Sequence, residues 1–281
     1  MNNKANGVYA NEDDKGKGGG KLQMPRKLVA IGLAFIYSIG STHLSYGNTN
    51  TVVNDEWGIY FEAPGRKPEI DISEDELKAH GAYYVGNDQD KHLYLTFDCG
   101  YESGYTWKML DILQKTDVPA TFFLLGSYIQ NNPALVERMI DEGHMVANHS
   151  MTHPENYVLS DIEALHWELA TTEKIFSEIT HLEMPKYYRP PKGKFNLSSL
   201  RAAQSLGYKT IFWSLAHVDW DEKNQPSNWA AIEKLVSCVH PGAVILLHNT
   251  SYTNVSILEE LINRYKKMGY SFMRLNTLVG A

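Results

Sequence analysis

Residues that can carry protons, bind a metal or hold charge recur where predicted strands end. These residues, each with the strand that it follows or ends, are Asp98 (93–98), His149 and His153 (145–149), Arg189 (187–189), Asp219 (210–215) and His248 (243–248). In parallel α/β folds the carboxyl ends of the strands and the loops after them meet at one rim. We therefore expect these side chains to converge on one site.

The role of each residue is ambiguous when it is considered alone. The spacing of His149 and His153 suits a metal, because neutral imidazoles are good zinc ligands and a carboxylate often completes such a site. Two ordinary loop histidines would have the same spacing. His248 ends an apolar strand and must find a hydrogen-bond partner, as a structural core histidine would too. Tyr101 and Trp220 could stack on sugar rings or simply pack. The joint placement of the set is what favours a functional site.

The elements between these positions alternate between strand and helix. Further strands are predicted over 120–125 and 271–275, and the helices carry clear end signals. These signals are Asn132-Pro133 with Gly143, Ser160 with Glu163, Ser198 or Ser199 with Gly207, and a start near Asn254 with Gly269. The alternation predicts an α/β fold around a parallel sheet, either an irregular (β/α) barrel or an open doubly wound sheet.

The N-terminal residues have the order of a secretory signal. Lys21, Arg26 and Lys27 precede an apolar run over 28–40, and small and polar residues follow it. The run is shorter than the ~20 residues that span a bilayer, so a cleaved signal is favoured over a retained membrane anchor. We expect a protein that is secreted or lies in the cell envelope, anchored to the membrane if the signal is retained. The expected divisions are 1–47, disordered start and signal; 48–90, linker and N-terminal extension; and 91–281, catalytic domain.

Composition narrows the class of partner. The chain has 281 residues, of which 43% are hydrophobic and 21% charged, as in ordinary globular proteins. Its formal net charge of -7 argues against nucleic acid, whose binding proteins usually present a basic face. Neither the glycine-rich dinucleotide fingerprint nor a P-loop occurs in the sequence. A cell-wall glycan strand is a compatible partner, and no protein partner is indicated.

Ordered motifs between residues 93 and 275 resemble the polysaccharide deacetylases of carbohydrate esterase family 4. The motifs are Thr96-Phe97-Asp98-Cys99-Gly100, His149-Ser150-Met151-Thr152-His153-Pro154, Arg189-Pro190-Pro191-Lys192-Gly193, Asp219-Trp220 and Leu246-Leu247-His248. Because they occur in the family's order, the resemblance is specific. It implies the family's distorted (β/α) barrel and the hydrolysis of acetamido groups on a polysaccharide.

The resemblance also implies a role for each motif residue. The roles are general base for Asp98, orientation of that base for Arg189, general acid for His248, tuning of that acid for Asp219, and binding of a divalent metal, usually zinc, for His149 and His153. A backbone N–H near Lys192 would stabilise the oxyanion. Trp220 and Leu246 would form the walls of the pocket for the acetyl methyl group.

One position departs from the family pattern. Most members have a second Asp in the first motif as a third metal ligand, where this chain has Cys99. A thiolate can bind zinc. The resemblance therefore leaves open a Cys-His-His site, or a metal that is held weakly or not at all.

A branch of the family that acts on N-acetylmuramic acid also lacks that second Asp. This branch forms the muramic δ-lactam of the bacterial spore cortex, and it is similar to this chain over 100–106 and 213–216. The similarity points to muramic acid in peptidoglycan as the substrate. The alternatives are an N-acetylglucosamine deacetylase acting on peptidoglycan or chitin oligomers, and a non-catalytic glycan-binding domain.

Overall fold

A computed structural model describes residues 55–154 and 161–278, which belong to one of the chain's two compact units. A nine-stranded sheet lies at its centre, and its strands pair in parallel. In order across the sheet the strands are β2 (Ala82–Tyr83), β8 (Lys209–Ile211), β6 (Tyr187–Tyr188), β5 (Met145–Asn148), β4 (Ala120–Leu124), β3 (His92–Cys99), β10 (Val244–His248) and β9 (Leu215–Ala216), with β11 (Ser271–Phe272) paired to the start of β3. A separate antiparallel pair joins β1 (Asp55–Glu56) to β7 (Lys194–Phe195).

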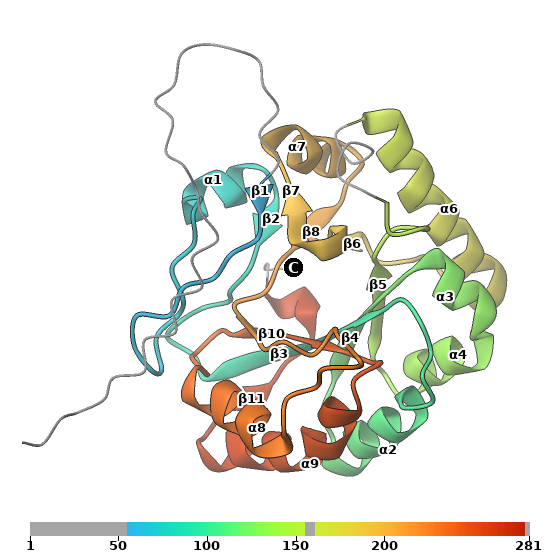
Figure 1. Ribbon diagram of the computed structural model, residues 1–281. Coiled ribbons are helices and arrows are strands. Elements are labelled where there is room, and N and C mark those ends of the chain that lie inside the picture. Colours follow the sequence, from blue (N-terminus) through green and yellow to red (C-terminus); the bar gives the residue numbers. More distant parts are fainter. Residues whose placement is uncertain (1–54, 155–160, 279–281) are drawn as a thin grey trace, which may run out of the picture. The chain divides into compact units, whose positions relative to one another are not determined.

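Helices surround the curled sheet (Figure 1). They are α1 (Glu74–Ala79), α2 (Thr106–Thr116), α3 (Gly126–Asn131), α4 (Pro133–Asp141), α6 (Ile162–Thr180), α7 (Leu197–Ser205), α8 (Asn228–Ser237) and α9 (Tyr252–Lys267), with 3-10 turns η1 (Pro191–Gly193) and η2 (Leu275–Thr277). Met109, Leu110 and Leu113 of α2 recur at helical spacing and are fully buried against the outer face of the sheet. Each such side chain stabilises the fold by ~1.5–3 kcal/mol through removal of apolar surface from water.

Residues of β3 alternate between the helix-covered face and the interior of the barrel. Leu95 and Phe97 belong to the core under the helices, whereas Tyr94, Thr96 and Asp98 face inward. The inward residues change along the strand from apolar at its amino end to polar at its carboxyl end. The strand therefore contributes to a packed core at one end of the barrel and to a polar site at the other.

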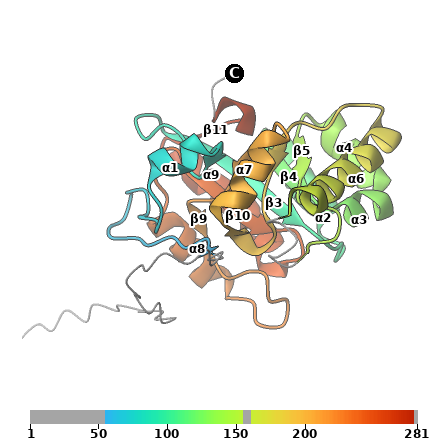
Figure 2. The ribbon, with the colours of Figure 1, turned by 90° about the horizontal axis from the view of Figure 1, so that it is seen from above.

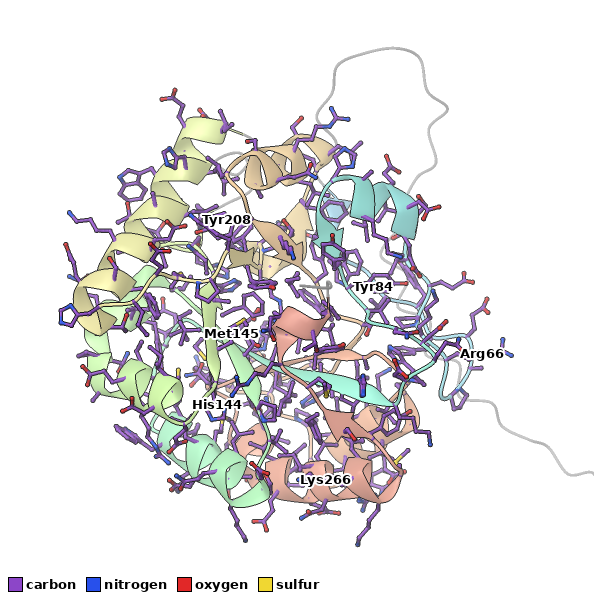
Figure 3. All side chains as sticks on the ribbon, turned by 180° about the vertical axis from the view of Figure 1, so that it is seen from behind. Arg66, Tyr84, His144, Met145, Tyr208 and Lys266 are labelled. Carbon is purple, nitrogen blue, oxygen red and sulfur yellow. The ribbon has the colours of Figure 1, made fainter. Side chains whose placement is uncertain are left out.

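The amino end of the barrel is filled by side chains. The buried members of this inner cluster are Tyr94, Phe123, Ala147, Ile211, Val244 and Leu275. Met145, labelled in Figure 3, packs against the cluster at the start of β5. Leu275 comes from η2, which lies at the centre of the ring of strands (Figure 1). Among the described strands β2 and β9 are the two edges of the sheet. This is the distorted (β/α) barrel that the motifs imply, and the open doubly wound sheet is excluded.

Residues 55–85, expected as part of a linker and extension, contribute to this architecture. β2 is an edge strand of the sheet, and the Trp57 ring stacks on Phe212 with 4.3 Å between the ring centroids. α1 lies beside α7 (Figures 1 and 2), where Nε of Arg201 donates to Nε2 of His80 at 2.9 Å. The segment thus packs on the barrel at the side of β7 and β8.

The single strand predicted over 210–215 is wrong, because this run forms both β8 and β9. The Phe212 N–H donates to the Tyr83 carbonyl beside β8, whereas the Ser214 N–H donates to the Val244 carbonyl beside β10. The chain thus passes from β8, next to the edge strand β2, to the opposite edge strand β9 within a few residues. The sequence of a continuous apolar run carries no signal for where one buried strand ends and the next begins.

Helix starts differ from the prediction by a few residues. The observed N-caps are Asp161 for α6, Asn196 for α7 and Ser251 for α9. Ser160 lies outside the described residues. Ser199 is the third residue of α7, where it forms the capping box with Asn196 instead of opening the helix. Neighbouring polar residues are all competent caps, so sequence places a helix start only approximately.

The apolar run at 28–40, expected to be the export signal, lies outside the described residues. Within 55–154 and 161–278, no helix is both long enough and apolar enough to span a bilayer.

Candidate active site

Asp98 lies at the carboxyl end of β3, with 6% of its surface exposed. Its Oδ1 accepts a hydrogen bond from Nη1 of Arg189 at 2.7 Å, and its Oδ2 lies 3.7 Å from Nε2 of His149. Burial alone would raise the pKa of Asp98, but the charge of Arg189 and its hydrogen bond outweigh that effect and hold the pKa below its ordinary value. Asp98 is therefore a carboxylate at neutral pH.

The guanidinium of Arg189 is fully buried and fixed on every side. Besides the carboxylate, it donates from Nη1 to Oγ1 of Thr96 at 2.9 Å, from Nε to the Ile211 carbonyl at 3.0 Å and from Nη2 to the Phe212 carbonyl at 3.3 Å. It also lies 4.1 Å from the centroid of the Phe123 ring. The planar fork of donors suits this geometry, which a lysine could not reproduce. Because no part of it is exposed, Arg189 orients the carboxylate without meeting solvent itself.

His149 and His153 lie next to this pair, with 5.3 Å between their ring centroids. Nδ1 of His149 donates to the Arg189 carbonyl at 2.8 Å, since a carbonyl can only accept. Nε2 of His149 is therefore unprotonated in the neutral ring and faces Asp98. The backbone of His153 has a φ of 59°, and its N–H donates to Oγ of Ser150. Burial, with a smaller effect of His149, lowers the pKa of His153 to about 4, so its ring is neutral too.

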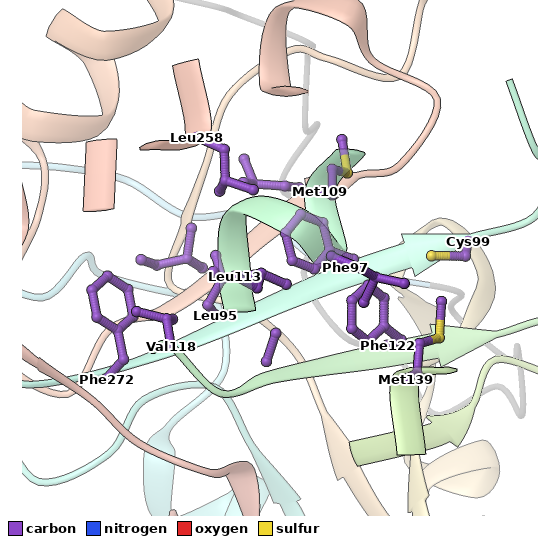
Figure 4. Close-up of a cluster of buried hydrophobic side chains, with 14 of the residues drawn as sticks. Leu95, Phe97, Cys99, Met109, Leu113, Val118, Phe122, Met139, Leu258 and Phe272 are labelled. Carbon is purple, nitrogen blue, oxygen red and sulfur yellow. The ribbon is translucent and has the colours of Figure 1, made fainter. Parts of the chain in front are cut away.

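The structure does not bring Cys99 to these histidines. Consecutive residues of a strand point to opposite faces, so the Cys99 thiol lies on the helix-covered side, away from the face that carries the Asp98 carboxylate. Figure 4 shows it in the hydrophobic cluster that also contains Phe97, Met109 and Met139. Burial raises the pKa of the thiol well above its ordinary value, which disfavours a thiolate ligand. The expected Cys-His-His set is therefore not assembled.

The donor set does not fit a three-ligand zinc site. Catalytic zinc normally has three protein ligands and one exchangeable position. Within the part of the chain that the structure describes, no group of three or more His, Cys, Asp or Glu side chains is arranged to hold a metal ion. His149 and His153 supply two neutral imidazoles. The chemistry of the site is therefore assigned to the protein's own acids and bases.

His248 and Asp219 form the second charged pair of the site. Nδ1 of His248 donates a hydrogen bond to Oδ1 of Asp219 at 2.8 Å, and the His248 backbone N–H donates to Oδ2 at 2.8 Å. Burial alone would lower the pKa of His248, but Asp219 outweighs it and raises the pKa above its ordinary value. Since Nδ1 is engaged, Nε2 is the atom that can give a proton to a substrate. The register pairs His248 directly with Asp98 on β3, so acid and base are neighbours.

Residues that the sequence interpretation missed support both pairs. Oγ1 of Thr96 accepts from Arg189 and donates to the Ile245 carbonyl at 2.6 Å. Nδ2 of Asn254 donates to Oδ2 of Asp219 at 2.6 Å. Thr96 was detectable, because a residue two positions before a strand-end acid faces the same side as that acid. Asn254 carried no such signal, since only the fold brings it to Asp219.

Leu246 and Trp220 border His248 in different ways. Leu246 lies two residues before His248 on the same face of β10 and is 5% exposed, outside the packed hydrophobic clusters. Trp220 follows Asp219 directly and is 67% exposed. Both positions are compatible with walls around an acetyl group, and that role stays a prediction.

Lys192 and Tyr101 also lie on loops that follow strands. Lys192 has a φ of 57° within η1, and its charge is close enough to His153 to help lower the pKa of that ring. Tyr101 is 79% exposed, and its backbone carbonyl accepts from Nδ2 of Asn249 at 2.8 Å. Their expected parts in oxyanion binding and sugar stacking remain predictions.

An ionised carboxylate and an imidazole acid lie side by side at the open end of the parallel barrel. A hydrolase needs such a pair, because one group activates water and the other protonates the leaving group. A family model described as polysaccharide deacetylase matches residues 85–211. The peptidoglycan-N-acetylmuramic acid deacetylase PdaA of Bacillus subtilis is 40% identical over 203 residues, which are 72% of this chain and 77% of that protein. The chain belongs to the polysaccharide deacetylase family, whose members hydrolyse N-acetyl amide bonds.

A solved structure and a second sequence relative agree with this assignment. The structure of Bacillus subtilis PdaA, described as a family 4 carbohydrate esterase, matches with a TM-score of 0.76 and 37% identity, over 80% of this chain and 96% of that one. The peptidoglycan-N-acetylglucosamine deacetylase PgdA of Listeria monocytogenes is 34% identical over 191 residues, which are 68% of this chain and 39% of that protein. The family and barrel predicted from the motifs are thereby confirmed.

Proposed function

We propose that this enzyme removes the N-acetyl group of N-acetylmuramic acid in peptidoglycan, the step that leads to the muramic δ-lactam of the spore cortex. The observation that carries hydrolysis is the adjacency of the Asp98–Arg189 and His248–Asp219 pairs on β3 and β10. The substrate is supported by the similarity to Bacillus subtilis PdaA. We further propose that the chain acts in the cell envelope, where peptidoglycan lies, after export directed by residues 28–40.

In the first step Asp98 acts as the general base. Its carboxylate takes a proton from a water molecule, and the water oxygen attacks the acetyl carbonyl carbon to give a tetrahedral intermediate. Arg189 keeps the carboxylate ionised and fixes its direction, so the base is available throughout the neutral range. The pair lies on the inner face of the barrel, where little solvent competes with it.

In the second step His248 acts as the general acid. The C–N bond breaks, the sugar nitrogen takes the proton from Nε2 of His248, and acetate and a free amine result. Asp219 favours the imidazolium form that this step needs, because it accepts from Nδ1 and raises the pKa of the ring. Proton exchange with solvent then restores Asp98 and His248.

The substrate contacts follow from the loops at the open end. We assign the backbone N–H at Lys192 to the oxyanion, because fixed donors at that position stabilise the charge that develops in acyl transfer. Leu246 and Trp220 flank the acetyl methyl group, and Tyr101 offers a ring on which a sugar can stack.

The family resemblance implies a divalent metal, which is zinc in most members. Among the described residues, only His149 and His153 are placed to be its ligands. We therefore propose that this chain holds such a metal weakly or not at all.

Defined peptidoglycan oligomers test the proposal. Purified enzyme is incubated with oligomers that keep or lack the stem peptide, and the products are located by fragment mass spectrometry. Loss of acetyl from muramic acid supports the proposal, whereas loss from glucosamine would establish the specificity that the similarity to PgdA suggests. Asp98→Asn should abolish acetate release, and the matched exposed variant Asp75→Asn should not. Glycan binding without release from any oligomer would establish a non-catalytic binding domain instead.

A further inference from the structure

The Asp219 carboxylate is held by more groups than its partnership with His248 requires. Oδ1 faces Nδ1 of His248, and Oδ2 accepts both the His248 backbone N–H and Nδ2 of Asn254, at 2.8 and 2.6 Å. The carboxylate is 1% exposed, so these contacts decide its rotation. The plane of the carboxylate is thereby fixed, with one oxygen facing the imidazole and the other accepting both remaining donors.

Asn254 is itself fixed from the helix that carries it. It is fully buried in the first turn of α9, and its backbone N–H donates to Oγ of the N-cap Ser251 at 3.0 Å. Its Nδ2 also donates to the His248 carbonyl at 3.0 Å. One amide nitrogen thus joins the carboxylate of Asp219 to the backbone of His248.

His217 sets the direction of the Asn254 amide. Nε2 of His217 lies 2.8 Å from Oδ1 of Asn254, and an amide oxygen can only accept. The imidazole must therefore carry its proton on Nε2, and the amide NH2 must point toward Asp219. A reversed amide would place its oxygen against the carboxylate and the His248 carbonyl, both of which repel it. The ring of His217 is buried, and Nδ1 has no partner within the described part of the chain.

We propose that Asn254 is a positioning residue for the acid step, with His217 fixing its amide, and that together they keep the proton of neutral His248 on Nδ1, so that Nε2 is always the atom that takes up the catalytic proton and gives it to the leaving nitrogen. The inference rests on the proposed deacetylation for its kinetic consequence only. Without the Asn254 donor, Asp219 can rotate away, and the imidazole loses the fixed acceptor that selects its tautomer.

The kinetic test compares variants of the full chain on the N-acetylated peptidoglycan substrate. Asn254→Ala should lower kcat on the order of tenfold with KM unchanged, the size seen when groups that orient catalytic ligands are removed. Ser256→Ala, an exposed change on the same helix, should leave both constants unchanged. His217→Phe should lower kcat less, and His217→Gln should restore it, because a glutamine amide can still donate to Asn254.

The tautomer of His248 distinguishes the two roles that Asn254 could have. It should change on substitution of Asn254 if that residue positions the acid, and stay the same if Asn254 only stabilises the fold. In 15N spectra of labelled, folded protein, wild type should show neutral His248 protonated on Nδ1 alone, and Asn254→Ala should show a mixture of tautomers. An unchanged tautomer and an unchanged kcat in Asn254→Ala would overturn the proposal. If that variant fails to fold, His217→Phe carries the same test. A wild type that releases no acetate refutes the proposed function, while the nitrogen spectra still decide the positioning role.

Discussion

Replacing Arg189 by Met should destabilise the fold by about 3–5 kcal/mol, the usual cost of removing one partner of a buried ion pair. The substitution keeps much of the side-chain volume but removes every donor of the guanidinium. Asp98 Oδ1 and the carbonyls of Ile211 and Phe212 lose hydrogen bonds of 2.7, 3.0 and 3.3 Å. Because all of these acceptors are buried, water cannot replace the lost bonds without opening the barrel.

The loss of stability in Arg189→Met should depend on pH in a defined direction. In wild type the pKa of Asp98 lies below its ordinary value, so Asp98 contributes stability at neutral pH that is lost as pH falls through that lowered pKa. Without Arg189 the effect of burial dominates and raises the pKa. The ionised carboxylate then destabilises the variant at neutral pH, and the penalty shrinks as acidification protonates it. The stability gap between wild type and variant should therefore narrow in mild acid.

Chemical denaturation at neutral and mildly acidic pH measures this gap, with the double variant Asp98→Asn, Arg189→Met as the control. Removing both charges should cost less than removing Arg189 alone, because no uncompensated carboxylate remains. A gap of the same size at both pH values, or a double variant less stable than Arg189→Met, would refute the reasoning.

Asp219→Asn should lower kcat on the order of a hundredfold and move the alkaline limb of the pH–rate profile to lower pH, because burial then lowers the pKa of His248 against the smaller effect of Asp98 alone. Chelation should leave most acetate release intact, and calorimetry should show weak zinc binding that is lost in His153→Ala, since no third ligand joins His149 and His153 within residues 55–154 and 161–278. Gly193→Ala should lower stability by about 2 kcal/mol or more in thermal unfolding, because φ is +66° there and a Cβ would lie 2.6 Å from an indole carbon.

Each of these expectations has a contrary result. An alkaline limb that stays in place in Asp219→Asn would assign the acid role to a group other than His248. Complete loss of activity with chelator, restored by zinc, would show a metal site that the arrangement of His149 and His153 does not reveal. An unchanged melting temperature for Gly193→Ala would mean that η1 adjusts to a side chain at low cost.

Local patterns were sufficient to predict the residues at strand ends but not the contacts between segments. Asp98, Arg189 and His248 were predicted because each ends a strand, and parallel strands end at one rim. The same reasoning, applied strictly, separates Cys99 from Asp98, because neighbours on a strand face opposite ways; the expected ligand came from family resemblance instead. Asn254 could not be predicted, since its hydrogen bond to Asp219 depends on how α9 is placed by the whole barrel.

The Arg189 contacts also constrain the order in which this molecule can become active. The guanidinium joins Asp98, 91 positions away in the chain, to Ile211, 22 positions away. Closing such long loops is slow compared with forming helices, so folding is governed by non-local strand pairing. The base is not oriented until β3, the end of β6 and β8 have come together. Recovery of acetate release during refolding should therefore lag behind recovery of helical circular dichroism, which makes enzymatic activity a reporter for the last stage of barrel assembly.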